Sequence, residues 1–223
     1  MAAPHRFPPA DDPEVSRELR MLMAGVTVVA ALLLGQRGVG PSAPPADAAG
    51  KPELRAGALR YEPGAATADQ QAVQAAIAAA RPEARRLVEA VDGSIEVRVG
   101  APAGGPVGLM ETTQDGYRVT LDLGLATAKY GQRGVSRLVL HELGHVVDHA
   151  LVPPGLAAQL DAATPRGYDT GGTGTGSSAT REERFAESFA KWATGDIGVD
   201  LYLGYAVPPP PVDWGVPLAR ILR

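Results

Sequence analysis

Two histidines and a glutamate stand together in the stretch His141-Glu142-Leu143-Gly144-His145. Helical residues four apart project from the same side, so the rings of His141 and His145 can bind one zinc ion at about 2.0–2.1 Å. Glu142 can lean over the same ion, accept a proton from a metal-bound water and later return it to a leaving amine. The pattern predicts a hydrolytic zinc site with Glu142 as general base.

The alternative interpretation is a pair of core histidines beside a surface glutamate. The apolar positions of the surrounding segment cover most of a helix circumference, which predicts a buried helix. Burying two imidazoles and a carboxylate without partners is costly, and a bound metal ion removes that cost. The composition of the helix therefore favours the metal site.

His149 extends the series of histidines but is poorly placed to be the third ligand. It lies eight residues beyond His141, about 12 Å along a helix axis, which is too far to share one ion with it. The metzincin pattern would require Gly at the position of Asp148 and His at that of Leu151. We expect His149 at the surface or behind the ligands.

Two glutamates of a later segment, Glu183 and Glu187, are the remaining candidates for the third ligand. They share a helix face with Ala186 and Ala190, whose small side chains would allow close approach to the histidine helix. Glu183 also ends the sequence Thr180-x-x-Glu183, a capping box in which its carboxylate would bond the backbone at the helix start. If Glu183 is a ligand, Glu187 is expected to orient a ligand histidine from behind. If Glu183 is only a cap, Glu187 takes the ligand role.

The paired segments HELGHVVD and EERFAESFA resemble those of the gluzincin metallopeptidases, especially enzymes similar to the catalytic domain of anthrax lethal factor. The resemblance covers roughly residues 134–195 and implies a peptide or protein substrate and Zn²⁺ as cofactor. The roles it implies are zinc ligands at His141, His145 and Glu183, a general base at Glu142 and a supporting carboxylate at Glu187.

One position departs from the pattern of this family. Such enzymes often carry a tyrosine about seven residues before the third ligand to stabilise the oxyanion, and here that position is Gly176. Tyr168 lies in the same Gly-rich stretch, 167–178, and is the candidate for this role, with the stretch acting as a flap over the cleft. The departure keeps open the interpretation as an envelope module that binds zinc or a peptide without turnover. A third interpretation is a structural envelope protein whose HExxH motif is accidental.

The elements expected to position these residues are helices and short strands. Pro82 should divide the alanine-rich helical segment Thr67–Val91, and Asp115-Gly116 should form a hairpin turn before the clearest strand, Tyr117–Leu123. The other expected elements are strands at Ser94–Gly100 and Val107–Thr112, and helices at Val135–Val152, Thr180–Gly195 and near Val216–Leu222.

Together these elements predict an α+β, zincin-like fold in which a small twisted sheet packs on the HExxH helix and on a second, Glu-bearing helix. The resemblance further implies that an edge strand beside the metal, most plausibly Tyr117–Leu123, pairs with an extended substrate.

The composition excludes several other site chemistries. The chain has no cysteine, which rules out disulfides, Cys-ligated zinc, iron–sulfur clusters and a thiol nucleophile. A net charge of −4 and a pI of about 5.6 give no global basic field, so nucleic acid is not an expected partner. Any metal must therefore be held by His, Asp or Glu.

Residues 1–48 are predicted to be a signal peptide or a membrane anchor. Met21–Gly35 carries no charge over fifteen residues, about 22 Å as a helix, which is shorter than the ~30 Å hydrocarbon core of a bilayer. Arg17 and Arg20 precede it, as in a secretory signal. Cleavage after Ala48 would release the chain, and an uncleaved segment would anchor it in the membrane. A buried core helix is the remaining alternative.

The rest of the chain divides into two parts. Residues 49–66 are expected to be a linker, and residues 67–223 the metallopeptidase-like domain. We therefore expect a secreted protein or one anchored to the membrane outside the cytoplasm. Its oligomeric state does not follow from the sequence.

Overall fold

The computed structural model of the chain describes residues 54–164, 180–197 and 207–222. The predicted signal or anchor segment, the flap at 167–178 and Tyr168 within it lie outside these residues. Across the part that is described, no helix has both the length and the apolar character needed to cross a membrane.

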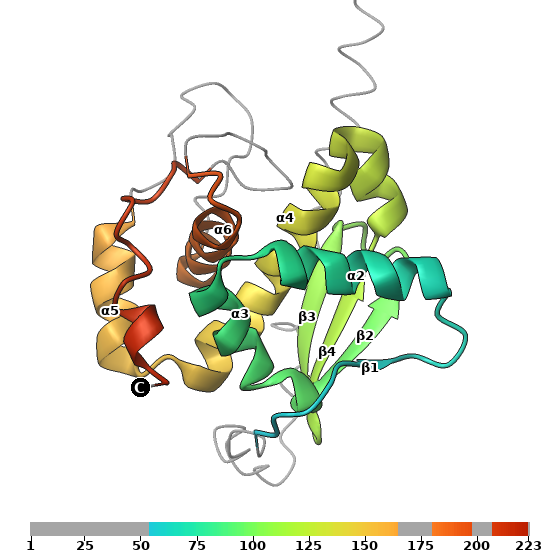
Figure 1. Ribbon diagram of the computed structural model, residues 1–223, viewed down its shortest axis with the longest axis horizontal. Helices are drawn as coiled ribbons and strands as arrows, with labels where there is room; N and C mark the ends of the chain where they lie inside the picture. The colour runs from blue at the N-terminus through green and yellow to red at the C-terminus, as the bar shows by residue number, and fades with distance from the viewer. Residues whose placement is uncertain (1–53, 165–179, 198–206, 223) are drawn as a thin grey trace, which may run out of the picture. The chain divides into compact units, whose positions relative to one another are not determined.

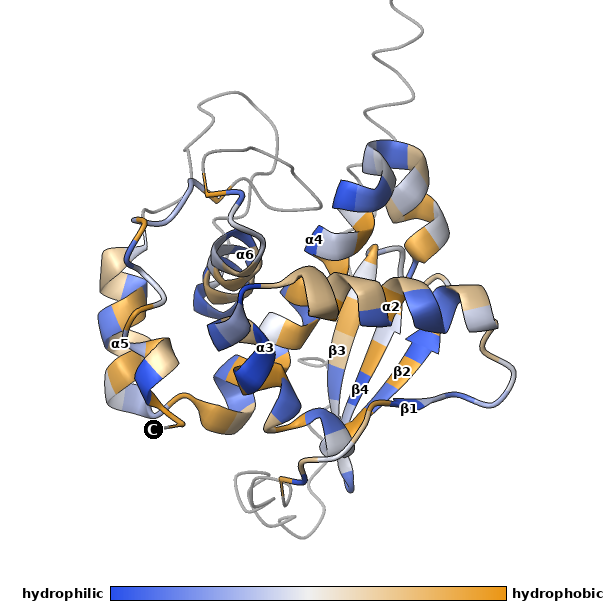
Figure 2. Cartoon of the chain, viewed as in Figure 1, coloured by the Kyte–Doolittle hydropathy of each residue, from blue (hydrophilic) through white to orange (hydrophobic). Residues whose placement is uncertain are grey.

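Four strands form one mixed sheet (Figure 1). β1 and β4 run parallel to β2, and β3 runs antiparallel to β4. Hydrophobic and hydrophilic residues alternate along the strands (Figure 2), and the apolar positions of β2 and β4 are buried, apart from the partly buried Val99. The strands, in the spatial order β1-β2-β4-β3, are β1 (Arg60–Tyr61), β2 (Ile95–Val99), β4 (Gly116–Leu121) and β3 (Gly108–Thr113).

The position of β4 corrects one expectation. We expected Tyr117–Leu123 to be an edge strand, but β4 lies between β2 and β3, and the edges of the described sheet are β1 and β3. A turn at Gln114–Asp115 folds β3 back along one side of β4, with Thr113 opposite Gly116, and β2 pairs with the other side. The clear apolar alternation of this segment is therefore that of an interior strand.

The ordered fold also begins earlier than the expected boundary at Thr67. Strand β1 lies inside residues 49–66, the segment expected to be a linker, and places Tyr61 opposite Val97 of β2. Leu59, just before the strand, is buried in the core. A strand of two residues has no alternation to detect, which is why the sequence pattern did not indicate it.

Within the described residues, six helical elements accompany α4. Pro82 starts α3 in its first turn, as predicted. Helix α5 was not predicted, because its one buried residue, Leu160, leaves no amphipathic pattern. These elements are α2 (Thr67–Ala79), α3 (Pro82–Glu89), α5 (Pro154–Ala163), α6 (Arg181–Thr194) and the single 3₁₀ turns η2 (Asp92–Ser94) and η3 (Leu218–Arg220).

The long helix α4 (Leu123–Leu151) is the centre of the fold. It contacts α2, β3 and β4 and makes its most extensive contact with α6 (Figure 1). Gly131, with φ 61° and ψ −152°, interrupts the helix, so the predicted segment Val135–Val152 corresponds to the part after this kink. Residues of this part are buried almost all round, as its composition predicted.

Helix α6 begins and ends as its sequence predicted. The Thr180 hydroxyl accepts a hydrogen bond from the backbone N–H of Glu183, and Gly195 follows the helix in a left-handed conformation at φ 75°. Its aromatic side chains pack against one another and against Trp214 of the C-terminal segment. The fold is thus α+β, with a four-stranded mixed sheet packed on a long helix that carries the histidines, and Glu183 on a second helix.

Candidate metal centre

The contact between α4 and α6 is close because small residues lie where the helices meet. A Cβ atom on Gly144 would lie 3.1 Å from the Cα atom of Ala186 and 3.1 Å from the Phe189 ring. From the sequence, we expected the alanines of α6 to allow the two helices to approach closely. The glycine inside the HExxH motif makes an equal contribution on the α4 side.

Three side chains from these helices converge. The Nε2 atom of His141 lies 3.2 Å from Oε2 of Glu183, and Nε2 of His145 lies 3.6 Å from the same oxygen. The two rings are nearly perpendicular, at 80°, with centroids 4.9 Å apart. One ligand atom from each residue lies within 4.8 Å of the others, and the three form a group that could hold a metal ion.

The separations of the two histidine nitrogens from the Glu183 oxygen suit a tetrahedral cation. Ligand atoms placed about 2.0–2.1 Å from a tetrahedral zinc ion are separated from each other by about 3.3 Å. The two nitrogen–oxygen separations, 3.2 and 3.6 Å, lie on either side of that value. Two imidazole nitrogens and one carboxylate oxygen also leave one tetrahedral position for a water or a substrate.

The structure separates the two predicted roles of Glu183. Its backbone N–H donates to the capping hydroxyl of Thr180 at 3.4 Å. Its carboxylate lies against the two histidine rings and not at the helix start. The carboxylate is therefore available to a metal ion.

Opposite charges hold this group together in the absence of a cation. Burial disfavours the charged form of His141, but hydrogen bonds to Glu183 and Glu187 outweigh it and raise the pKa of the ring to about 10. Burial likewise disfavours the carboxylate of Glu183, but its hydrogen bonds to His141 and His145 outweigh it and lower its pKa to about 2. A divalent cation would replace the proton on His141 and keep the carboxylate charged.

Glu142 lies beside this group. It is buried, and burial raises the pKa of its carboxyl group, against the opposing attraction of His141 and His145. It also faces the edge strand: a Cβ atom on Gly108 of β3 would lie 2.3 Å from its Oε1 atom. Only glycine lets the edge strand approach the carboxylate this closely, so the backbone of β3 borders the site.

Glu187 lies behind His141, on the side away from Glu183. Its Oε2 atom accepts a hydrogen bond from Nδ1 of His141 at 3.2 Å. Its Oε1 atom is bound by Arg137 and lies 3.5 Å from Nζ of Lys191. Sequence reasoning missed Arg137 and Lys191, although each lies four residues from a site residue on its own helix, at positions that pack inward.

His149 and Asp148 lie outside this group, as expected for His149. The Nδ1 atom of His149 lies 3.0 Å from the hydroxyl of Tyr117 on β4. Asp148 forms a two-pronged ion pair with Arg181 at 3.1 and 2.6 Å, which joins the end of α4 to the start of α6. These contacts fasten the elements around the site without entering it.

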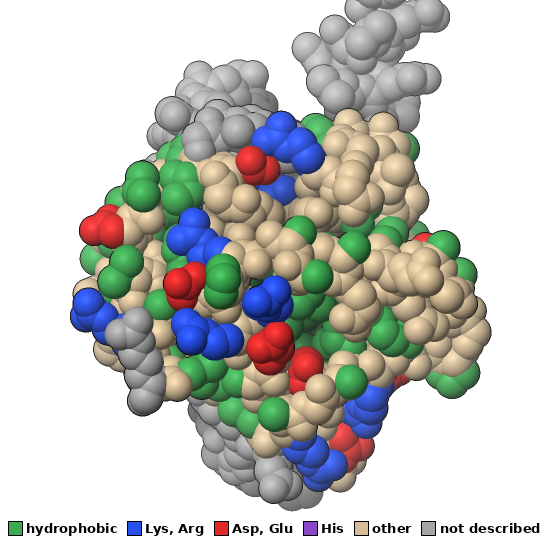
Figure 3. Space-filling model, in the orientation of Figure 1, with side chains coloured by type: hydrophobic (Ala, Val, Ile, Leu, Met, Phe, Trp, Pro, Cys, Tyr) green, Lys and Arg blue, Asp and Glu red, His purple; other side chains and the backbone are tan. Residues whose placement is uncertain are grey.

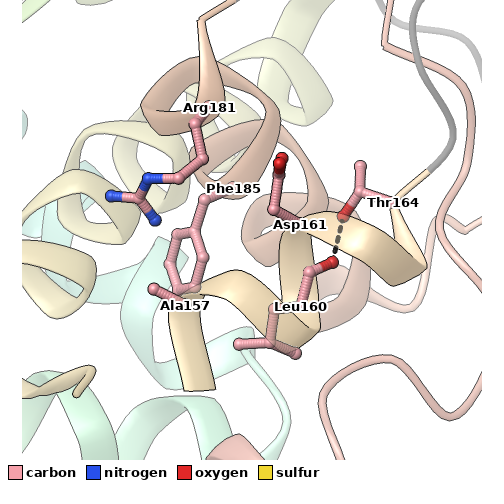
Figure 4. Close-up of a pocket in the computed structure, with 6 residues that line it drawn as sticks. All are labelled: Ala157, Leu160, Asp161, Thr164, Arg181 and Phe185. Carbon is pink, nitrogen blue, oxygen red and sulfur yellow. Dashed lines mark hydrogen bonds between the residues drawn. The ribbon is translucent and has the colours of Figure 1, made fainter. Parts of the chain in front are cut away.

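The metal centre does not open on the face shown in Figure 3. Positive and negative side chains are interspersed there, and none of the described histidines is visible. A small pocket between α5 and α6 lies apart from the histidines as well (Figure 4), and its Thr164 hydroxyl is bonded to the Leu160 carbonyl. That pocket is lined by Ala157, Leu160, Asp161, Thr164, Arg181 and Phe185.

Comparison of the chain with protein-family models, with curated proteins and with solved structures finds no match. The chain itself provides a His141–His145–Glu183 group that could hold a metal ion, on two helices packed against a small mixed sheet.

Proposed function

We propose that this chain is a zinc-dependent metallopeptidase with a zincin-like fold. The observation that carries the proposal is the convergence of His141, His145 and Glu183 within 4.8 Å, next to the buried carboxylate of Glu142. The ligand set of two imidazoles and a carboxylate suits zinc, and the open fourth position is the arrangement of catalytic rather than structural zinc sites. Other divalent ions fit similar ligands, so metal analysis belongs in the test.

Zinc, when bound, would polarise the peptide carbonyl and lower the pKa of a water molecule toward neutrality. Glu142 would accept a proton from the attacking water as its oxygen bonds to the carbonyl carbon. The same residue would then pass the proton to the amine nitrogen as the C–N bond breaks. The raised pKa of Glu142 suits the first step, because a more basic carboxylate accepts a proton more readily.

The edge strand β3 is the proposed place for the substrate. An extended peptide can add to a free sheet edge through backbone hydrogen bonds, which read the backbone more than the side chains. Gly108 brings this edge against Glu142, so a peptide paired with β3 would pass beside the base. This role replaces the one expected for Tyr117–Leu123. Tyr168, in the proposed flap at 167–178, remains the candidate to stabilise the oxyanion.

We further propose that the protein acts outside the cytoplasm, secreted or anchored to the membrane by Met21–Gly35. The support is the uncharged segment and the arginines before it. The proposed partners are a peptide or protein substrate and, if the signal is not cut, the membrane. A nucleic-acid partner is not proposed.

The second candidate is a module that binds zinc or a peptide without turnover. The observation that favours it is Gly176, which stands where related enzymes often carry the tyrosine that stabilises the oxyanion.

One experiment separates the two candidates. The full chain is purified, its zinc content is measured, and cleavage of a broad peptide library is followed with and without a chelator. For the peptidase, Glu142→Gln should keep its zinc and lose cleavage by about 10²–10⁴-fold, since the general base is gone. Glu182→Gln is the matched control: this side chain is 57% exposed, and the substitution should change neither property.

Each outcome decides between them. Glu142→Gln that cleaves as fast as the unaltered chain contradicts the proposed mechanism. A chain that holds one zinc ion but cleaves no peptide supports the binding module instead.

A further inference from the structure

A buried cluster of charges lies behind the candidate metal ligands. Glu187, with 3% of its side chain exposed, contacts Arg137 and Lys191, whose side chains are both fully buried. One carboxylate thus faces two cations in the interior. Burying such groups is expensive, and apolar side chains of similar volume would fill the space as stably or more so. The cluster therefore requires an explanation beyond packing.

The two oxygens of Glu187 have different partners. Oε1 is bound by Arg137 and approached by Lys191 at 3.5 Å, whereas Oε2 faces Nδ1 of His141 at 3.2 Å. With Oε1 occupied by cations, the carboxylate cannot turn, and Oε2 stays directed at the histidine ring. Since a carboxylate only accepts, Nδ1 must donate to Glu187, so a ring that gives up its other proton to bind a metal ion carries its lone pair on Nε2, which faces Glu183 and His145.

Arg137 makes an incomplete set of hydrogen bonds for a buried guanidinium. Its Nη2 atom binds Glu187, while its Nε and Nη1 atoms have no partner among the described residues. A side chain placed for its own stability would satisfy these donors. Arg137 is committed to Glu187 at the expense of its other nitrogens.

The cluster is built by helix spacing. Arg137 lies one turn before His141 on α4, and Lys191 lies one turn after Glu187 on α6. Lys191 is tied in addition to the carbonyl of Val207. Arg137 thus reaches Glu187 from α4, whereas Lys191 approaches it along α6.

We propose that Arg137 is a positioning residue of the metal centre: by locking Glu187, it fixes the tautomer and rotation of His141 and so sets the affinity of the site for zinc. This inference rests on the proposed metal site and extends it to a residue that contacts neither metal nor substrate. Lys191 supports the same carboxylate from the α6 side.

The test measures zinc affinity of the full chain by competition with a chromophoric chelator, and the visible absorption spectrum of the cobalt-substituted protein. Arg137→Met should weaken zinc binding by about 10–100-fold and shift the cobalt bands, because His141 is no longer held. Arg137→Lys keeps the charge but loses the planar fork, so it should recover part of the affinity. Arg133→Met, on the same helix one turn away and paired with Asp196, should leave both readouts unchanged.

A double-mutant cycle separates positioning from general stability. If Arg137 acts through Glu187, Arg137→Met should change zinc affinity little in a chain that already carries Glu187→Gln. If its effect is purely structural, Arg137→Met should weaken zinc binding by the same factor with and without Glu187→Gln. If Arg137→Met does not fold, Arg137→Lys takes its place in the cycle, with an expected loss of about threefold to tenfold.

Unchanged affinity in the Arg137 variants, or an undiminished effect in the Glu187→Gln background, overturns the positioning role alone. An unaltered chain that binds no zinc overturns the metal site and this inference together, so the two failures are distinguishable.

Discussion

The two nitrogens of the His141 ring face two glutamates of the same helix in very different surroundings. On one side, Glu183 has 22% of its side chain exposed and contacts the rings of His141 and His145. On the other, Glu187 is almost wholly buried and carries its own cations, Arg137 and Lys191. The two residues are one helical turn apart and are chemically identical in the sequence.

The difference shows how neighbours assign a role to a side chain. Glu187 is already neutralised by two cations, so it can orient a histidine but has little charge to offer a metal ion. Among the described residues, Glu183 is balanced by the histidine rings alone, and a divalent cation can take the place of the proton on His141. The carboxylate of Glu187 is therefore expected to keep its partners when a metal ion binds, whereas that of Glu183 is expected to exchange a proton-bearing ring for the ion.

Removing each carboxylate in turn tests this contrast most strongly. Glu183→Ala should weaken zinc binding by more than about 100-fold, because a ligand is lost. Glu187→Ala should weaken it by about 10–100-fold, because only the orientation of the His141 ring is lost. Competition with a chromophoric chelator measures both. A larger loss for Glu187→Ala than for Glu183→Ala would reverse the assignment of ligand and support.

The spacing of the two helices offers a second, smaller perturbation. Gly144→Ala would press a methyl group against the Ala186 backbone and the Phe189 ring at 3.1 Å, which should cost about 1–3 kcal/mol of unfolding free energy and lower zinc affinity as α6 moves away. Urea denaturation and the chelator titration measure these effects. Gly155→Ala in α5 is the control, because its added Cβ meets nothing within 4 Å and alanine favours the helix. Equal stability of the two variants would mean that α4 and α6 are not closely packed.

The smallest expected effect is the pH dependence of stability without metal, since solvent screens the partly exposed Glu183. The pKa of His141 is raised from 6.5 to about 10, so its contribution is complete below pH 6.5 and is lost as the pH rises toward 10. The pKa of Glu183 is lowered from 4.5 to about 2, so its contribution is complete above pH 4.5 and is lost as the pH falls toward 2. The pair should therefore stabilise the metal-free protein most between pH 4.5 and 6.5.

Urea denaturation across this pH range, in chelator and in excess zinc, checks the prediction. The stabilisation added by zinc should grow as the pH rises, since His141 must lose its proton to bind the ion. Substituting Glu183 by Gln should flatten the dependence seen in chelator. A metal-free stability that rises from pH 6.5 to 9 would contradict a protonated His141.

Helical periodicity was sufficient to predict α6 and the part of α4 after Gly131, which carry the candidate metal group, but it did not predict the first part of α4, which begins at Leu123. Thr180 and Gly195 mark the ends of α6, and Pro82 marks the start of α3. The strand that borders the site was assigned wrongly, because alternation reports burial and not whether a neighbour lies on one side or both. Gly108, the residue that brings the edge to Glu142, carries no periodic signal at all.

The choice between Glu183 and Glu187 could not be made from spacing, since both lie on the same helix face. The choice depends on Arg137 and Lys191, which are buried against Glu187. Their charge alone indicates exposed positions, and only the packing of the helices shows that they are buried. A charged side chain in an otherwise apolar stretch, four residues from a candidate ligand, was the available indication.

Residues 207–222 pack against helix α6, where Lys191 donates a hydrogen bond to the carbonyl of Val207. Trp214 of the same segment contacts Phe185 and Trp192 of α6, and its indole N–H donates to Leu160 and Thr164 at α5. The helix that carries Glu183 and Glu187 is thus covered in part by residues from far along the chain. Loss of residues 207–222 is therefore expected to expose Lys191 and loosen its contact with Glu187.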